Sequence, residues 1–186
     1  AIGLVGSRVV GPTIADDIKS GAVYSIIFSL IVVFLYILIR FRKWQFSLGA
    51  VVALLHDVLF VMGVFSLADG FLPFQLEVDQ AFIAAILTVI GYSLNDTVVV
   101  FDRIRENMGS RGKQNGVSVN KSLNQTLSRT FNTSLTTFFV LLVIFLFGGE
   151  VIRGFMFALL LGVLVGTYSS LFIATPVMFD ASDKES

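Results

Sequence analysis

Five long apolar runs occupy most of the 186-residue chain and limit its possible folds more than any other feature. Each is close to the roughly 20 residues that a helix needs to cross a bilayer at about 1.5 Å per residue. A helix satisfies its own backbone hydrogen bonds, as lipid requires. We therefore predict an all-α, polytopic membrane protein with five transmembrane helices, at residues 21–39, 46–67, 81–101, 126–147 and 154–179.

Composition supports this class. The chain is 55% hydrophobic and only 14% charged, whereas soluble domains are about 45–50% apolar and about 25% charged. A net charge of zero argues against a nucleic-acid partner. The chain has no cysteine and a single histidine, which excludes a thiolate metal site and leaves little for a histidine-rich one. We expect no metal and no cofactor.

The two ends differ from the apolar middle. Residues 1–20 carry several charges and lack the basic start and apolar stretch of a signal peptide. We interpret them as the end of a domain outside the membrane, with a strand-like stretch at 2–10 and a helix N-cap at Thr13. Residues 21–179 form the predicted helix bundle, and 180–186 a short polar tail. The chain is expected to be a piece of a longer protein.

Charged loops predict the orientation. The loop after the first apolar run and the loop between the third and fourth runs hold most of the Lys and Arg, whereas the loop at 68–80 has none. By the positive-inside rule, these two basic loops and the C-terminus face the cytoplasm. The N-terminal residues and the other two loops then face outward. The polar segment at 109–120 is predicted to be a flexible linker.

The third apolar run contains Asn95 and Asp96 about a turn and a half before its end. On insertion scales, placing an aspartate near the centre of a membrane helix costs roughly 2.5–3.5 kcal/mol of insertion free energy. Such a residue is a functional-site hypothesis, and we assign Asp96, together with its neighbour Asn95, a role in ion movement. The alternative is a structural carboxylate satisfied by Asn95, Ser93 or Thr97.

Other ionisable residues could act with Asp96. By helix rise, Asp96 lies about 7–8 Å from the cytoplasmic end of its run and Arg129 about 4–5 Å into the next one, so the two could pair. His56 and Asp57 lie near the middle of the second run, and Asp102 lies at the cytoplasmic mouth. Together these groups could form a proton route. Structural hydrogen bonding is the alternative for His56 and Asp57.

Two stripes at three- to four-residue spacing add to this picture. The fourth run presents hydroxyls beside an arginine, which either line a hydrated pathway or join helices by hydrogen bonds. These residues are Thr126, Arg129, Thr130, Thr133 and Thr137. Small residues in the fifth run should let another helix approach closely. They are Gly154, Ala158, Gly162, Gly166, Ser170 and Ala174.

Several segments together resemble the SecF family, including the SecF half of fused SecDF proteins. They are VIGYSLNDTVVVFDRIREN at 89–107, LSRTFNTSLTT at 127–137, LLHDV at 54–58, LFGGEVIRGF at 146–155 and VGPTIADDI at 10–18. The resemblance covers nearly the whole chain in order, and the first segment is the most specific. It implies the fold of resistance-nodulation-division (RND) transporters, in which a six-helix half carries a periplasmic domain between its first two helices. This chain would hold helices two to six.

The resemblance also implies a function. SecF proteins assist the SecYEG channel, together with SecD, in exporting preproteins across the bacterial cytoplasmic membrane, and are thought to use the proton-motive force. Asp96 and Arg129 match the family's proton-coupling residues, with a partner carboxylate supplied by the SecD half. The expected surroundings are the lipid bilayer, the SecD half, SecYEG and preproteins, with protons or sodium ions as the coupling ion.

Three other functions remain open at this stage. The chain could be half of another RND-type, proton-coupled exporter of small molecules or lipids. It could be a membrane-embedded hydrolase, although His56 and Asp57 have no convincing nucleophile at helical spacing. It could also be a passive structural subunit. We predict that it is not an enzyme.

Overall fold

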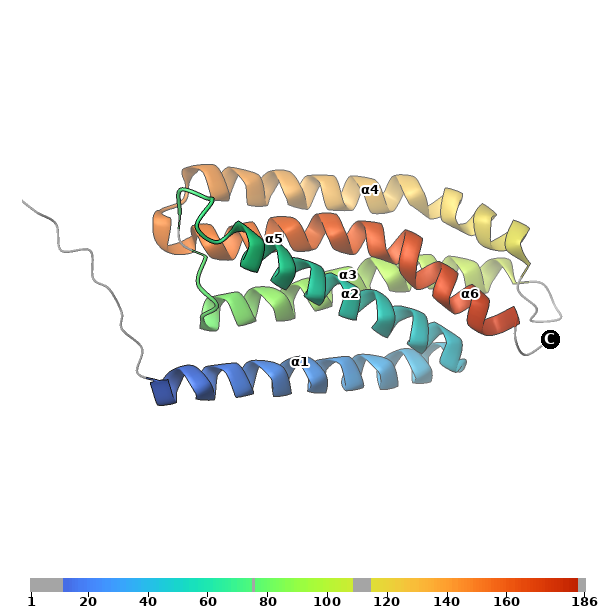
Figure 1. The fold of residues 1–186 in the computed structure, drawn as a ribbon. Helices are drawn as coiled ribbons and strands as arrows, with labels where there is room; N and C mark the ends of the chain where they lie inside the picture. Colours follow the sequence, from blue (N-terminus) through green and yellow to red (C-terminus); the bar gives the residue numbers. More distant parts are fainter. Residues whose placement is uncertain (1–11, 75, 109–114, 184–186) are drawn as a thin grey trace, which may run out of the picture.

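The computed structural model describes residues 12–74, 76–108 and 115–183, and all of its regular structure is helical (Figure 1). The predicted strand at 2–10 lies outside these residues. The elements are α1 (Pro12–Phe41), α2 (Trp44–Ala68), α3 (Gln80–Asn107), α4 (Gly116–Phe147), α5 (Glu150–Ser169), the π-helix η1 (Ser170–Ala174) and α6 (Thr175–Asp183).

Five segments of the described chain are long and apolar enough to cross a membrane, in agreement with the five predicted runs. They are Lys19–Phe41, Trp44–Ala68, Gln80–Asn107, Gly116–Phe147 and Glu150–Ser182, the last combining α5, η1 and α6. The chain is therefore a multi-pass membrane protein.

Some helices extend beyond the predicted runs. α1 begins at Pro12, so Thr13 lies inside the helix and is not the predicted N-cap. Proline suits a first helical position because its missing N–H would be unpaired there in any case. α3 continues to Asn107, and α4 begins at Gly116.

The linker predicted at 109–120 is wrong for residues 116–120, which are the first turn of α4. A capping box at Asn115 starts this helix. The Asn115 side chain accepts a hydrogen bond from the Val117 backbone N–H at 3.1 Å, and the Ser118 hydroxyl accepts one from the Asn115 backbone N–H at 3.4 Å. These bonds satisfy backbone donors that have no partner within the helix.

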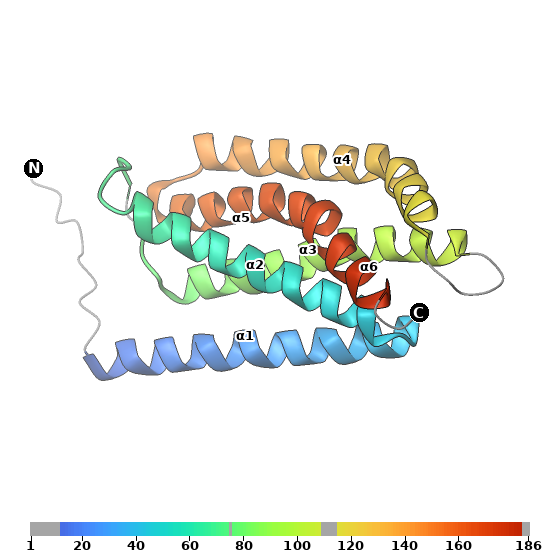
Figure 2. The ribbon, with the colours of Figure 1, turned by 45° about the vertical axis from the view of Figure 1, so that its right-hand side comes forward.

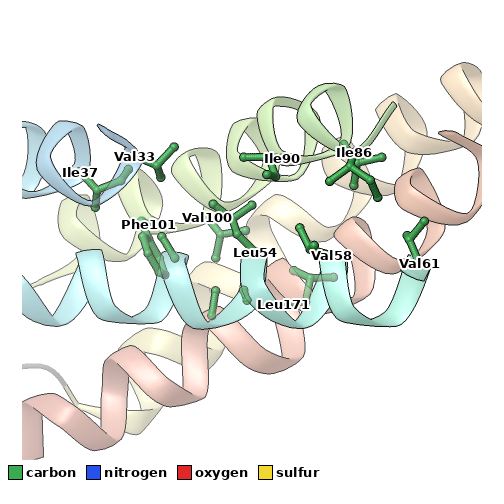
Figure 3. Close-up of a cluster of buried hydrophobic side chains, with 14 of the residues drawn as sticks. Val33, Ile37, Leu54, Val58, Val61, Ile86, Ile90, Val100, Phe101 and Leu171 are labelled. Carbon is green, nitrogen blue, oxygen red and sulfur yellow. The ribbon is translucent and has the colours of Figure 1, made fainter. Parts of the chain in front are cut away.

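The core lies between α2, α3 and α5, with α1 along one edge and α4 along the opposite edge (Figures 1 and 2). Both edge helices are mostly exposed. Figure 3 shows the buried side chains where α1, α2, α3 and η1 meet; labelled are Val33, Ile37, Leu54, Val58, Val61, Ile86, Ile90, Val100, Phe101 and Leu171.

Small residues let α5 approach α3 at very short range. A Cβ added at Gly162 would overlap the Val89 side chain, and one added at Gly166 would lie 2.8 Å from Ser93 Cβ. Ala158 and Ser170, from the same stripe, are buried, and Gly154 is half-buried. The stripe therefore faces the interior of the bundle, as a run of small residues at four-residue spacing should.

The last span changes its helical pitch near Pro176. A proline has no N–H to donate to the carbonyl four residues earlier, here that of Phe172. The π-helix η1 (Ser170–Ala174) ends two residues before this proline, and the Thr175 hydroxyl donates to the Ser170 carbonyl at 3.2 Å. Gly49 of α2 lies directly against the Ala174 carbonyl, where a Cβ would overlap it. This irregular turn is thus packed against α2.

One end of the bundle, called here the basic end, holds the arginine-rich turns of α1 and α3. Arg40 Nη2 and Asp102 Oδ1 form an ion pair at 3.0 Å, and Arg105 donates to the Arg40 carbonyl at 3.4 Å. Both side chains of the pair are about two-fifths exposed, at 42% and 41%. An ion pair this exposed contributes less than about 1 kcal/mol because water and salt screen it.

We predict that Gly162→Ala destabilises the bundle by about 1–3 kcal/mol, because the added methyl group must displace Val89. The measurement is SDS-induced unfolding in mixed micelles. Gly91→Ala on α3 is the matched control, since its Cβ would meet nothing within 4 Å. Equal stability of the two variants would contradict this account of the α3–α5 contact.

We predict that Asp102→Asn lowers stability by less than about 1 kcal/mol, because its only described side-chain bond is the exposed pair with Arg40. Exchanging the two charges, Arg40→Asp with Asp102→Arg, should restore the wild-type unfolding midpoint. A large loss in the single variant that the exchange does not repair would show that Asp102 has another role.

Candidate ion-coupling site

Asp96 lies in the middle of the packed bundle and not on its lipid-facing surface. Only 3% of it is exposed. Its Oδ2 accepts a hydrogen bond from the Ser134 hydroxyl of α4 at 3.2 Å, and Ser134 Oγ accepts one from Thr167 Oγ1 of α5 at 2.6 Å. We call these three residues the Asp96 cluster. It joins α3, α4 and α5 through one carboxylate and two hydroxyls.

The neighbours in sequence do not satisfy Asp96. Asn95 is exposed, Thr97 donates to the Ser93 carbonyl at 3.1 Å, and the Ser93 hydroxyl donates to Asp57. The hydrogen bond described for Asp96 comes from another helix. Its charge state is therefore linked to how α4 and α5 pack against α3.

Arg129 lies on an exposed face of α4. Among the described residues, no ion pair within 4.0 Å joins it to Asp96. The guanidinium sits at the end of a long, flexible side chain. The direct pair with Asp96 suggested by helix rise is thus not formed here.

The predicted hydroxyl stripe of α4 divides between two faces. Thr126 and Thr130 are buried, and the same face continues one turn later with Ser134. Thr133 is exposed, and Thr137 is half-buried and accepts a hydrogen bond from the Tyr92 hydroxyl at 3.2 Å. Thr130 Oγ1 is buried and has no partner in the described chain. The inward face of α4 is therefore polar along three consecutive turns.

A second buried carboxylate belongs to α2. Asp57 is fully buried, and its Oδ2 accepts hydrogen bonds from the hydroxyls of Ser93 at 2.6 Å and Ser169 at 2.8 Å. Its Oδ1 lies 3.2 Å from His56 Nδ1. We call these four residues the Asp57 cluster. Although neighbours in sequence point about 100° apart on a helix, His56 and Asp57 meet through their side chains.

These positions do not form a nucleophile and base for hydrolysis. Both serines donate to Asp57, and the described side-chain hydrogen bond of His56 is also to Asp57. A serine nucleophile would instead donate its proton to the histidine. Among the described residues there is also no group of three His, Cys, Asp or Glu side chains that could hold a metal ion.

Asp102, predicted at the mouth of the route, lies at the basic end in its exposed pair with Arg40. The described side-chain bonds of Asp102 do not link it to either buried carboxylate. The prediction missed Ser134, Thr167 and Ser169. Ser134 continues the four-residue spacing of Thr126 and Thr130, so the pattern could have shown it. Thr167 and Ser169 can be recognised as members of these clusters only from the packing of α5 against α3.

Comparisons with known proteins concern the family of the chain. The family model for "Protein export membrane protein SecD/SecF, C-terminal" matches residues 3–184. Similar relatives are the protein translocase subunits SecF of Rhodothermus marinus, 60% identical over 95% of this chain and 58% of the relative, and of Thermodesulfovibrio yellowstonii, 48% identical over 91% and 55%. The chain thus spans little more than half the length of these relatives.

Two solved structures are also similar. A SecDF crystal structure in a super-membrane-facing form has a TM-score of 0.80 and 38% identity, covering 95% of this chain and 23% of the other. A SecDF structure from Thermus, described as a translocon-associated membrane protein, has a TM-score of 0.78 and 40% identity, covering 95% and 24%. The family model, which matches nearly the whole chain, and these similar relatives and structures show that the chain belongs to the SecD/SecF C-terminal family of protein-export membrane proteins.

Proposed function

We propose that this chain is the membrane part of a SecF subunit that couples the proton-motive force to protein export, with Asp96 as the residue that carries the coupling proton. The observation that supports this most is the burial of Asp96 in a membrane-spanning bundle with a hydrogen bond from a different helix. A carboxylate kept in such a place at an insertion cost of roughly 2.5–3.5 kcal/mol is usually functional.

Protonation of Asp96 would change the contacts between helices. An ionised carboxylate can only accept hydrogen bonds, and Ser134 donates to it. A protonated carboxyl can itself donate, so Ser134 is no longer required as a donor. Thr167 donates to Ser134 and also lies 2.8 Å from the Val163 carbonyl, which gives its single hydroxyl proton two acceptors. The bonds joining α3, α4 and α5 can therefore be rearranged by one proton.

Arg129 would stabilise the ionised state of Asp96 through its positive charge. Its exposed position on α4 leaves the guanidinium free to approach a carboxylate from a neighbouring subunit. We assign this place to the SecD half, as the family resemblance implies. When Asp96 is neutral, the attraction between α3 and the charged side chain of α4 is removed.

The energy available is sufficient for such a switch. One charge that crosses the membrane is worth about 2.3 kcal/mol per 100 mV. A difference of that size shifts a two-state equilibrium by well over tenfold. In this proposal the basic end faces the cytoplasm, and the rearrangement moves a domain outside the membrane that pulls preproteins from SecYEG. The protein would act as a transport subunit and not as an enzyme.

We predict that Asp96→Asn in the full-length protein abolishes the stimulation of preprotein export by an imposed proton gradient, because the amide cannot be ionised. The assay uses membrane vesicles that contain SecYEG and the SecD partner. Asp102→Asn is the matched control, since it also removes one carboxylate from α3 but at an exposed position. Full stimulation in the Asp96→Asn vesicles would exclude Asp96 from coupling.

The same vesicles can identify the ion. We expect stimulation to follow a proton gradient and not a sodium gradient imposed at equal pH. Ser134→Ala should reduce the stimulation of export by the proton gradient several-fold without abolishing it. The Asp96 carboxylate remains in this variant but loses its described hydrogen bond. Stimulation by sodium alone would replace the proton with sodium in the proposal.

A further inference from the structure

The proposed function leaves the most deeply buried carboxylate of the described chain, that of Asp57, without a role. Asp57 is completely buried. Aspartates are rarely buried to this extent unless they are paired with another group. Two hydroxyl protons reach the same oxygen, Oδ2, while the other oxygen, Oδ1, faces the imidazole of His56. The two oxygens thus have different partners.

Asp57 lies at nearly the same depth as Asp96. Its partner Ser93 is three residues before Asp96 on α3, which is about 4.5 Å along the helix toward the end opposite the basic end. Its partner Ser169 is two residues after Thr167 on α5, about 3 Å toward the basic end. These offsets have opposite directions. The same two helices, α3 and α5, therefore hold both carboxylates at one level.

Few charges surround Asp57. Within the apolar stretches of the elements packed on α2, the acidic or basic groups are His56 of α2 itself and Asp96 of α3. The other titratable groups there are the phenols of Tyr24, Tyr36, Tyr92 and Tyr168. Arg40 of α1 and Asp180 of α6 lie near the basic end. The one described basic group beside the Asp57 carboxylate is therefore the His56 imidazole.

His56 connects this buried acid to the outside of the bundle. Its side chain is 36% exposed, whereas that of Asp57 is 0% exposed. An imidazole has two ring nitrogens, so it can take up a proton on one nitrogen and release a proton from the other. The imidazole thus lies between Asp57 and whatever surrounds this part of α2.

We propose that His56 and Asp57 form a second proton-binding site, which exchanges protons through the imidazole and is linked to Asp96 through α3 and α5. This proposal rests on the proposed function, because it adds a second proton carrier to the same bundle. A hydronium ion gives a proton to Nε2 of a neutral His56 that carries its own hydrogen on Nδ1, and water is left. The imidazolium then passes the Nδ1 proton to an ionised Asp57 at Oδ1, which leaves a neutral imidazole protonated on Nε2 and a neutral carboxyl.

The link to α5 depends on a single hydroxyl proton. Ser169 Oγ lies 2.8 Å from Asp57 Oδ2 and 3.2 Å from the Gly166 carbonyl, and it can donate to only one of them. An ionised Asp57 is the stronger acceptor. When the carboxyl is neutral, the bond within α5 competes better. Ser169 is directly followed by η1. The change of acceptor by the Ser169 hydroxyl would therefore occur where the helix is already irregular.

The test is infrared difference spectroscopy of the intact SecD–SecF complex in lipid, with aspartate labelled with carbon-13, after a change in pH. Among the isotope-sensitive carboxyl bands of the wild type, one should belong to Asp57 and one to Asp96. Asp57→Asn should remove one band, Asp96→Asn should remove the other, and Asp102→Asn should leave both. Because the clusters share α3 and α5, each substitution should also shift the remaining band.

The outcomes separate the two proposals. If Asp57→Asn leaves the difference spectrum unchanged although the complex is folded, the second site is wrong while the role of Asp96 stands. If only the Asp57 band is present, the role of Asp96 fails while the second site stands. If both bands occur but neither responds to the other substitution, the link through α3 and α5 is overturned.

His56→Gln and Ser169→Ala guard against misfolding of Asp57→Asn. His56→Gln keeps the carboxylate and a polar neighbour but removes the titratable ring. It should slow the appearance of the Asp57 band several-fold after a pH jump without removing it. Ser169→Ala should shift that band in frequency and leave its rate unchanged. Unaltered kinetics in His56→Gln would overturn the route through the imidazole.

Discussion

The cost of placing a carboxylate away from water is the constraint on which the rest of this structure depends. Asp96 and Asp57 are both buried in a bundle built to cross a membrane, and each is held by hydroxyls from other helices. Each such bond compensates part of the water lost on burial. The hydroxyl side chains that bond these carboxylates also join the helices. The charge state of each carboxylate and the packing of the helices around it therefore cannot vary independently.

α5 supplies a hydroxyl to the cluster around each buried carboxylate. Its small residues bring its backbone against α3, and this close approach places Thr167 beside Ser134 and Ser169 beside Asp57. A bulkier residue at Gly162 would move both hydroxyls away together. The turn of π-helix that follows gives the last span an irregular segment at the same depth, and such turns are frequent at functional sites.

Much of this could be predicted from the sequence. The five spans follow from the length of the apolar runs alone. The free-energy cost of placing an aspartate in lipid identifies Asp96 as a functional-site candidate. Helix ends were less predictable, because the polar first turns of α4 are stabilised by a cap at Asn115 and not by hydrophobicity. The partners of the carboxylates could not be predicted, since helix rise gives depth but not which face of α4 or α5 turns inward. For that reason Arg129 was expected beside Asp96, where Ser134 lies instead.

In the proposed mechanism, neutralising Asp96 changes how α4 packs on the bundle. The most direct measurement is the distance distribution between spin labels on α4 and α2 in the intact complex, at the exposed positions Phe147 and Leu67. This chain has no cysteine of its own to interfere with labelling. We predict that Asp96→Asn shifts the distance distribution to that of the wild type at low pH. Identical distributions for both proteins at every pH would contradict it.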